Sequence, residues 1–196
     1  MPGFVAPVAD EREGLLAYLA QQRHVLRISA YGLTDEQARA TPTASSLSVG
    51  GLIKHAASAE RGWITVVEQR PREWSREAHE AGLRLGPDET LAGVLEGYEQ
   101  VAKETEAVIA GIPDLGQPVP VPKEVSWVPG VEAWSVRWVL LHLIEETARH
   151  AGHADIIRES LDGATALPLM AAVEAWPANP WCAPWKPLAR QPGWAN

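Results

Sequence analysis

The sequence has little cysteine and no long uncharged apolar run. Its only cysteine, Cys182, has no partner for an intrachain disulfide bond, which suits a reducing compartment. No stretch approaches the roughly 20 apolar residues that a membrane span needs. The N-terminal residues MPGFVAPVADEREG also lack the basic start and apolar stretch of an export signal. We therefore expect a cytoplasmic protein that does not enter a membrane.

Concentrated positive charge is also missing. The chain carries 17 Lys and Arg against 25 Asp and Glu, a net charge of -8, and the basic residues form no cluster. Because binding to phosphates needs a concentrated positive surface, we expect no nucleic-acid partner. What is present is 46% apolar residues over 196 positions, which is enough for one sizeable core.

Apolar residues recur at helical spacing in four long stretches and do not alternate with strand patterns. They predict helices over 10–31, 48–70, 91–111 and 135–161. Ser135 is suited to cap the last helix and Gly163 to end it. Thr34 and Gln37 resemble a capping box, which predicts a short extra helical turn over TDEQARA, residues 34–40. The fold class that follows is all-α, a four-helix bundle with long connections.

Two connections and the end of the chain interrupt this pattern. Residues 70–87 are rich in charge, glycine and proline and are predicted to be a loop, and residues 113–130 contain five prolines, with a short edge strand possible at 123–128. Residues 164–196 hold six prolines and four tryptophans. We expect a bundle over 1–163 and a tail over 164–196. Because exposed tryptophans are costly, the tail should lie against the bundle or against a partner chain. We also expect a homodimer.

The last predicted helix carries a stripe of groups that can bind a metal or a proton. In LHLIEETARHAGHAD, residues 141–155, His142 is followed by Glu146, His150 and His153. A helix advances about 100° per residue, so these three lie at roughly 40°, 80° and 20° from His142. A carboxylate and imidazoles inside an apolar bundle cost several kcal/mol unless something compensates them, and a divalent cation would do so.

A third ligand would come from the second helix. His55 lies on its apolar side and is the candidate, because two ligands on one helix and one on a facing helix form a three-ligand site with an open position. The spacing alone leaves the pair on the last helix open. It allows His142 with Glu146, Glu146 with His150, or His150 with His153.

Two stretches of the sequence resemble a known superfamily. LSVGGLIKHAASAERGWI, residues 47–64, and WSVRWVLLHLIEETARHAGHADIIRESLDG, residues 134–163, are similar to the DinB-like superfamily, in the branch with mycothiol-dependent enzymes such as maleylpyruvate isomerases. The resemblance covers about residues 10–165 and implies a four-helix bundle with a metal centre. In that branch the first of the two ligands on the last helix is Glu, so the resemblance implies His55, Glu146 and His150 as the ligands.

The resemblance implies a metal-dependent transferase that uses a low-molecular-weight thiol, with mycothiol as cosubstrate and a small electrophile as the other substrate. Zinc is the expected metal, and nickel, iron or manganese would suit the same ligands. His142 is the candidate for proton transfer, and His153 is left outside the metal ligands. The alternatives are a metal-dependent hydrolase on the same site, or a non-enzymatic dimer that binds a metal or a small ligand. Maleylpyruvate isomerases carry a further C-terminal domain, for which we expect residues 164–196 to be too short.

Other reactive or aromatic residues receive structural interpretations. Cys182 has no basic group near it in sequence and is interpreted as incidental. His79 lies in the charged loop and is expected to carry no chemistry. Trp63, Trp134 and Trp138 are interpreted as core anchors, one of which could line a substrate pocket. Three arginines are expected to form solvated ion pairs with nearby carboxylates, and the groups concerned are Arg61, Arg137 and Arg149 with Glu60, Glu145 and Glu146.

Overall fold

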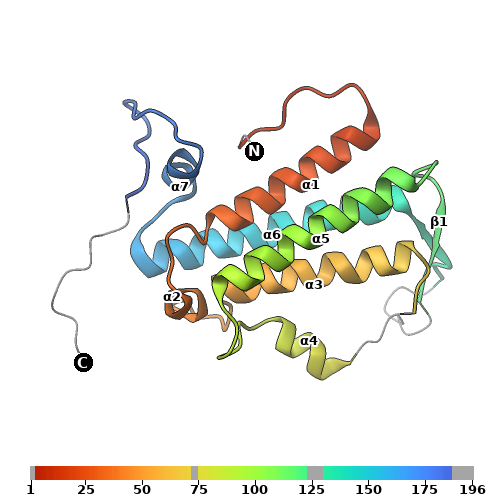
Figure 1. The fold of residues 1–196 in the computed structure, drawn as a ribbon, viewed down its shortest axis with the longest axis horizontal. Coiled ribbons are helices and arrows are strands. Elements are labelled where there is room, and N and C mark those ends of the chain that lie inside the picture. Colours follow the sequence, from red (N-terminus) through yellow and green to blue (C-terminus); the bar gives the residue numbers. More distant parts are fainter. Residues whose placement is uncertain (1–2, 72–74, 123–129, 187–196) are drawn as a thin grey trace.

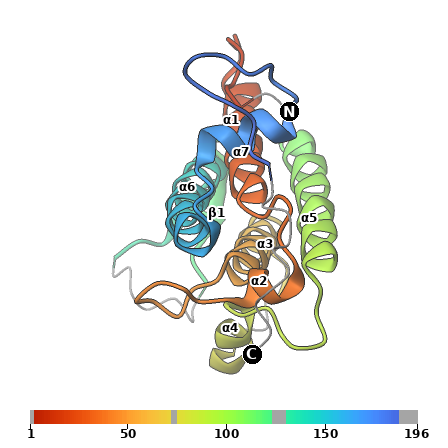
Figure 2. The same ribbon diagram turned by 90° about the vertical axis from the view of Figure 1, so that its left-hand side faces the viewer.

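The computed structural model describes residues 3–71, 75–122 and 130–186, and four long helices dominate it (Figure 1). They are α1 (Glu11–Ile28), α3 (Val49–Val67), α5 (Leu91–Gly111) and α6 (Val136–Asp162). α1 packs against α6, and α3 packs against both α5 and α6. The view along the helices shows these four as a bundle (Figure 2). The predicted all-α fold is therefore confirmed.

Side-chain caps fix where the long helices begin. Each is preceded by a residue whose side-chain oxygen accepts a hydrogen bond from the backbone N–H three positions later. These caps are Asp10, Ser48, Thr90 and Ser135. α6 ends at Gly163, whose φ of 76° lies in the left-handed region that glycine adopts without strain. Both ends of α6, the helix that carries the stripe, are therefore those predicted from the sequence.

The shorter elements confirm one prediction and overturn another. α2 (Asp35–Arg39) has the predicted capping box, in which Thr34 and Gln37 bond each other's backbone N–H groups. The loop predicted over 70–87, however, contains a further helix, α4 (Arg76–Gly82), capped by Ser75 and packed against α3. β1 (Pro118–Pro120) pairs antiparallel with β2 (Ala133–Ser135). The strand predicted over 123–128 lies outside the described residues.

The chain after Gly163 contacts α1. α7 (Ala166–Val173) lies against α1, where Leu169 and Met170 are buried beside Ile28. Trp176 and Trp185 pack against the same cluster, whereas Trp181 is 95% exposed, contrary to what we expected of the tail's tryptophans. Trp194 lies outside the described residues. The division into a bundle over 1–163 and a tail over 164–196 stays a prediction.

The bundle core consists of two apolar clusters separated by a polar layer. One cluster includes Leu26, Ile53 and Ile157, and the other includes Leu19, Ile64, Ile109 and Leu143. The polar layer lies between them along each helix, and its buried members are Arg23 on α1, Glu60 on α3, Thr105 on α5 and Thr147 on α6. No helix in the described part of the chain is long and apolar enough to cross a membrane.

The polar layer is held together by a buried ion pair. The Arg23 guanidinium donates from Nε to Glu60 Oε2 at 3.0 Å and from a terminal nitrogen to Oε1 at 2.6 Å. Thr105 donates its hydroxyl to the same Oε1 at 2.5 Å. The expectation that Glu60 belongs to a solvated ion pair is therefore wrong, because its carboxylate is enclosed and fixes α3 against α1 and α5. Arg61, by contrast, is paired with Glu104 in an exposed position.

Candidate metal centre

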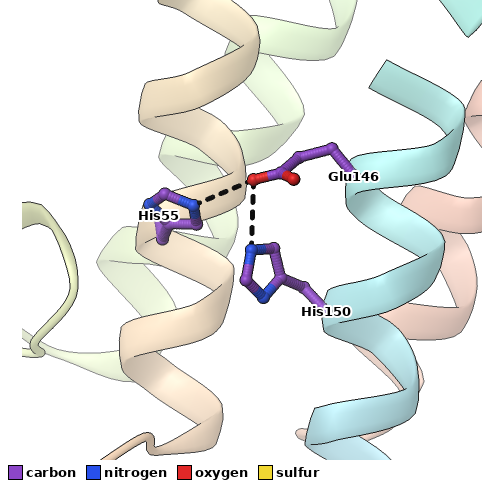
Figure 3. Close-up of side chains that lie close together, drawn as sticks. All are labelled: His55, Glu146 and His150. Carbon is purple, nitrogen blue, oxygen red and sulfur yellow. Dashed lines mark hydrogen bonds and ion pairs between the residues drawn. The ribbon is translucent and has the colours of Figure 1, made fainter. Parts of the chain in front are cut away.

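His55, Glu146 and His150 meet between α3 and α6 (Figure 3). Figure 3 shows His55 on α3 pointing across to Glu146 and His150 on α6. Nε2 of His55 lies 3.2 Å from Glu146 Oε1, and Nε2 of His150 lies 3.1 Å from the same oxygen. One ligand atom from each of the three residues lies within 4.8 Å of the other two. Of the pairs that the spacing left open, the structure thus brings Glu146 and His150 together with His55.

The positions follow from the helices that carry the residues. Glu146 and His150 are one turn apart on α6, so they project from the same side of it. His55 lies beside Leu52, Ile53 and Ala56 on α3. These three side chains are buried, so this side of α3 faces the other helices. The packing of α3 on α6 then closes the distance between the two helices.

The electrostatics of the cluster favour an ionised carboxylate. Hydrogen bonds from the imidazoles of His150 and His55 hold the pKa of Glu146 far below its usual range. The side chains are 12% exposed for His55, 26% for Glu146 and 14% for His150. The three groups are therefore enclosed by protein on most sides and still reach solvent.

The three residues fit a divalent cation. Zinc binds imidazole nitrogens and carboxylate oxygens at about 2.0–2.2 Å in tetrahedral geometry, which puts neighbouring ligand atoms about 3.3 Å apart. The separations of 3.2 and 3.1 Å between Glu146 Oε1 and the two imidazole nitrogens are close to this spacing. A carboxylate oxygen between two imidazole nitrogens is also a donor set that zinc, iron, nickel and manganese accept. Among the described residues, no other group of three or more such side chains is placed to hold a metal ion.

The other histidines of the stripe lie outside this group. His142 points its Nδ1 toward Glu145 Oε2 at 3.7 Å, and its ring stacks on Trp138 with centroids 5.1 Å apart. The exposed side chain of His153 lies with its ring 5.6 Å from that of His150. Both residues therefore flank the cluster on α6 without joining it.

His79 is the neighbour that the sequence did not reveal. It lies on α4, and its exposed ring is 5.9 Å from that of His55 in an edge-on arrangement. Ser75 followed by REAHEAG has the cap and the helix-favouring residues of a short helix, which was the available signal. That α4 folds back onto α3 could not be read from spacing. The expectation that His79 lies in a loop is therefore wrong, and the expectation that it carries no chemistry stays a prediction.

Cys182 and the predicted surface pairs have ordinary structural surroundings. The Cys182 backbone forms a short bridge with Asn179 in the segment after α7, and its thiol is unpaired. Arg137 pairs with Glu11, and Arg149 lies 3.8 Å from Glu145, both in exposed positions. Both pairs are solvated, as expected, but the partner of Arg137 is Glu11 and not one of the carboxylates that the sequence suggested.

Comparison with known proteins points to one family. The model of the Mycothiol-S-transferase family matches residues 14–163, a range that holds all three residues of the cluster. Among solved structures, a conserved protein from Enterococcus faecalis is similar with a TM-score of 0.62 and 13% sequence identity, over 80% of this chain and 100% of that chain. At this identity the likeness shows a shared fold alone. No curated protein matches the chain in sequence.

Proposed function

Because the chain belongs to the Mycothiol-S-transferase family, we propose that it is a metal-dependent enzyme that joins the thiol mycothiol to a small electrophile. The observation that carries the metal dependence is the convergence of two imidazoles and one carboxylate from α3 and α6. Zinc is the cation we propose, and nickel, iron or manganese would suit the same donors.

His55, Glu146 and His150 would hold the cation. Glu146 would contribute the single negative charge of the three ligands. A divalent cation bound there would supply positive charge that favours the thiolate form of a thiol, the nucleophilic form at neutral pH. The partial exposure of the three side chains leaves an approach from solvent for the two substrates.

His142 is the residue we assign to proton transfer. It lies one turn before Glu146 on the same side of α6, with its side chain 24% exposed. The thiol loses its proton to the imidazole, the sulfur forms a bond to the electrophilic carbon, and the leaving group departs with its bonding electron pair. The nearby carboxylate of Glu145 would stabilise the charge that His142 gains. The proton then passes to solvent.

Thiol dependence tests this function. Protein loaded with zinc is mixed with mycothiol and either a chlorobimane or 1-chloro-2,4-dinitrobenzene, and the conjugate is measured with and without the thiol. We expect conjugation only when metal and mycothiol are both present. Absence of thiol consumption with metal bound would overturn the proposal, and so would consumption of ester substrates without thiol, which would indicate a hydrolase.

A matched set of variants locates the activity. His55→Ala and His150→Ala each remove one imidazole and should lower kcat/KM at least about 100-fold, the effect typical of losing a metal-binding or catalytic group. His24→Ala is the control, because His24 lies on α1 and pairs with Glu174 of the tail, away from the cluster. It should stay within about twofold of the wild type. Equal losses in all three variants would indicate a general effect on folding, and the assignment would fall.

The homodimer and the cytoplasmic location stay predictions. Apolar side chains exposed on α6, Leu141 and Ile156, are the surface that we propose a second copy covers. Light scattering should then give twice the mass of one chain. A Leu141→Glu/Ile156→Glu double variant should give the mass of one chain.

A further inference from the structure

The candidate metal centre lies within a series of four imidazole rings, each beside the next, which we call the histidine row. Its members, in order, are His79 on α4, His55 on α3, and His150 and His153 on α6. The ring centroids of successive members lie 5.9, 4.8 and 5.6 Å apart. The packing of α4 on α3 brings in His79, and His153 is a neighbour of His150 on the surface of α6 because it lies three residues later. The row therefore has two ligands of the centre in its middle and one further histidine at each end.

The two ends of the histidine row reach solvent more fully than its middle. The side chains of His55 and His150 are only 12% and 14% exposed, whereas His79 and His153 are exposed residues. In the middle both imidazoles already bond to Glu146 Oε1, so an arriving cation has to displace these contacts while it loses its own water. An exposed imidazole can instead turn toward a hydrated cation at the surface within nanoseconds. The outer histidines are therefore the ring nitrogens that a cation from solvent meets first.

The separations in the row allow neighbouring rings to share one cation. Zinc lies about 2.0–2.1 Å from each imidazole nitrogen that binds it, so the ring centres of two imidazoles on one zinc ion lie about 5–6 Å apart. The three separations along the row, 4.8–5.9 Å, are all close to this value. A cation held by an outer ring can thus gain a nitrogen of the adjacent inner ring before it loses the outer one.

Resting on the metal-dependent function proposed above, we infer that His79 and His153 capture a divalent cation at the surface and deliver it to the two inner histidines. Among the described residues, the group placed to hold an ion is His55, Glu146 and His150, so the outer histidines bind the cation only in passage. A ligand used only in passage lowers the barriers to entry and to exit by the same amount, so it changes both rates and leaves the affinity unchanged. The inference gives His79 a binding role, against the prediction that it carries no chemistry.

The rates of zinc binding and release test this inference. Metal-free protein is mixed with zinc by stopped flow, and a fluorescent zinc indicator reports the zinc that stays free. Release is measured from loaded protein in an excess of the indicator. In the double variant His79→Gln/His153→Gln the association and dissociation rate constants should both fall about tenfold, within the one to three decades over which association rates vary between related variants. The dissociation constant from equilibrium dialysis should stay within about twofold of the wild type.

Two controls separate capture by imidazole from other effects. His24→Gln replaces a histidine on α1 that pairs with Glu174, away from the row, and should change neither rate. Glu80→Gln removes an exposed negative charge beside His79 on α4 and should also change neither rate, since imidazole nitrogens and not the local charge capture the cation. If Glu80→Gln slows zinc uptake as much as the double variant does, attraction by charge accounts for the effect and the inference is overturned.

The double variant can also contradict the inference directly. Both positions are exposed, so it should fold as the wild type does. Unchanged rates would mean that the outer histidines take no part in loading. Faster release with unchanged association would mean that one of them is a permanent fourth ligand. In either case the wild type still saturates with zinc, and the metal-dependent function stands. A wild type that takes up no zinc refutes the metal centre itself, and the inference falls with it.

Discussion

Arg23 and Glu60 form the buried ion pair of the polar layer, and we expect the loss of one partner to destabilise the bundle strongly. The two side chains are 5% and 1% exposed and are joined by two hydrogen bonds. In Arg23→Met the volume is nearly kept, and the Glu60 carboxylate loses its cation while it stays enclosed. Breaking a buried pair in this way costs about 3–5 kcal/mol. That is a large part of the roughly 5–15 kcal/mol by which a domain is stable.

Thermal unfolding measures this cost. For a chain of this size each kcal/mol of lost stability lowers the melting temperature by about 2–4 °C, so Arg23→Met should melt about 6–20 °C below the wild type. The matched control is Arg76→Met, which removes an exposed pair with Glu80 on α4 and should cost less than about 0.5 kcal/mol. The double variant Arg23→Met/Glu60→Leu removes both charges and should recover at least about 2 kcal/mol of the loss.

Two outcomes would refute this reasoning. A loss below about 1 kcal/mol in Arg23→Met would mean that the pair behaves as a surface pair. A double variant no more stable than Arg23→Met would mean that the unpaired carboxylate is not the cause of the loss. Since Glu60 lies on α3 five residues after His55, we also expect the single variant to weaken the metal centre.

Two further changes test other features. Burial and, less strongly, the charge of Glu159 raise the pKa of Asp155 to about 6, so the folded state binds the proton more tightly and stability falls as pH rises from about 4 to 6. Asp155→Asn should therefore raise the unfolding free energy at pH 7–8 by no more than about 1 kcal/mol after solvent screening, and an equal gain at pH 3.5 would contradict this. Gly51→Ala would place a Cβ 2.4 Å from the backbone oxygen of Leu83 and should lower the unfolding free energy by about 1–3 kcal/mol. Gly97→Ala on α5, with open space around it, should instead raise it by about 0.5–1 kcal/mol, and equal effects of the two would contradict the assigned crowding.

The long helices could be predicted because two local signals agree in the sequence. Apolar residues recur at helical spacing, and a capping side chain stands at each start, as Ser48 and Ser135 do. α4 has a capping serine but is too short for an apolar repeat, and α7 is short and has no side-chain cap. In α7 the proline at 168 also argued against a helix, although in the first turn its missing N–H costs nothing.

The candidate site was predictable in its composition but not in its pairing. His142, Glu146, His150 and His153 share one stripe, so spacing cannot say which of them faces His55. That choice depends on how far α3 and α6 are displaced along each other, which the packing of whole helices decides. The resemblance to the superfamily supplied the choice before the structure did.

Buried charge was the least predictable feature. Glu60 was expected in a solvated ion pair, because most glutamates are exposed, and nothing in the sequence singled out Arg23 as its partner. They are buried because residues on three helices pair with one another, and such a pairing has no signature within any one helix. The same reason explains why the position of His79 beside His55 was missed.

Elemental analysis of protein purified without added metal tests the central proposal most directly. If His55, Glu146 and His150 hold a cation, the wild type and His24→Ala should each contain about one divalent ion per chain, as expected of a three-ligand site. His55→Ala and His150→Ala should each retain less than about a tenth of it. Wild-type protein well below one ion per chain after incubation with zinc, or variants that keep the full metal content, would contradict the proposed metal centre.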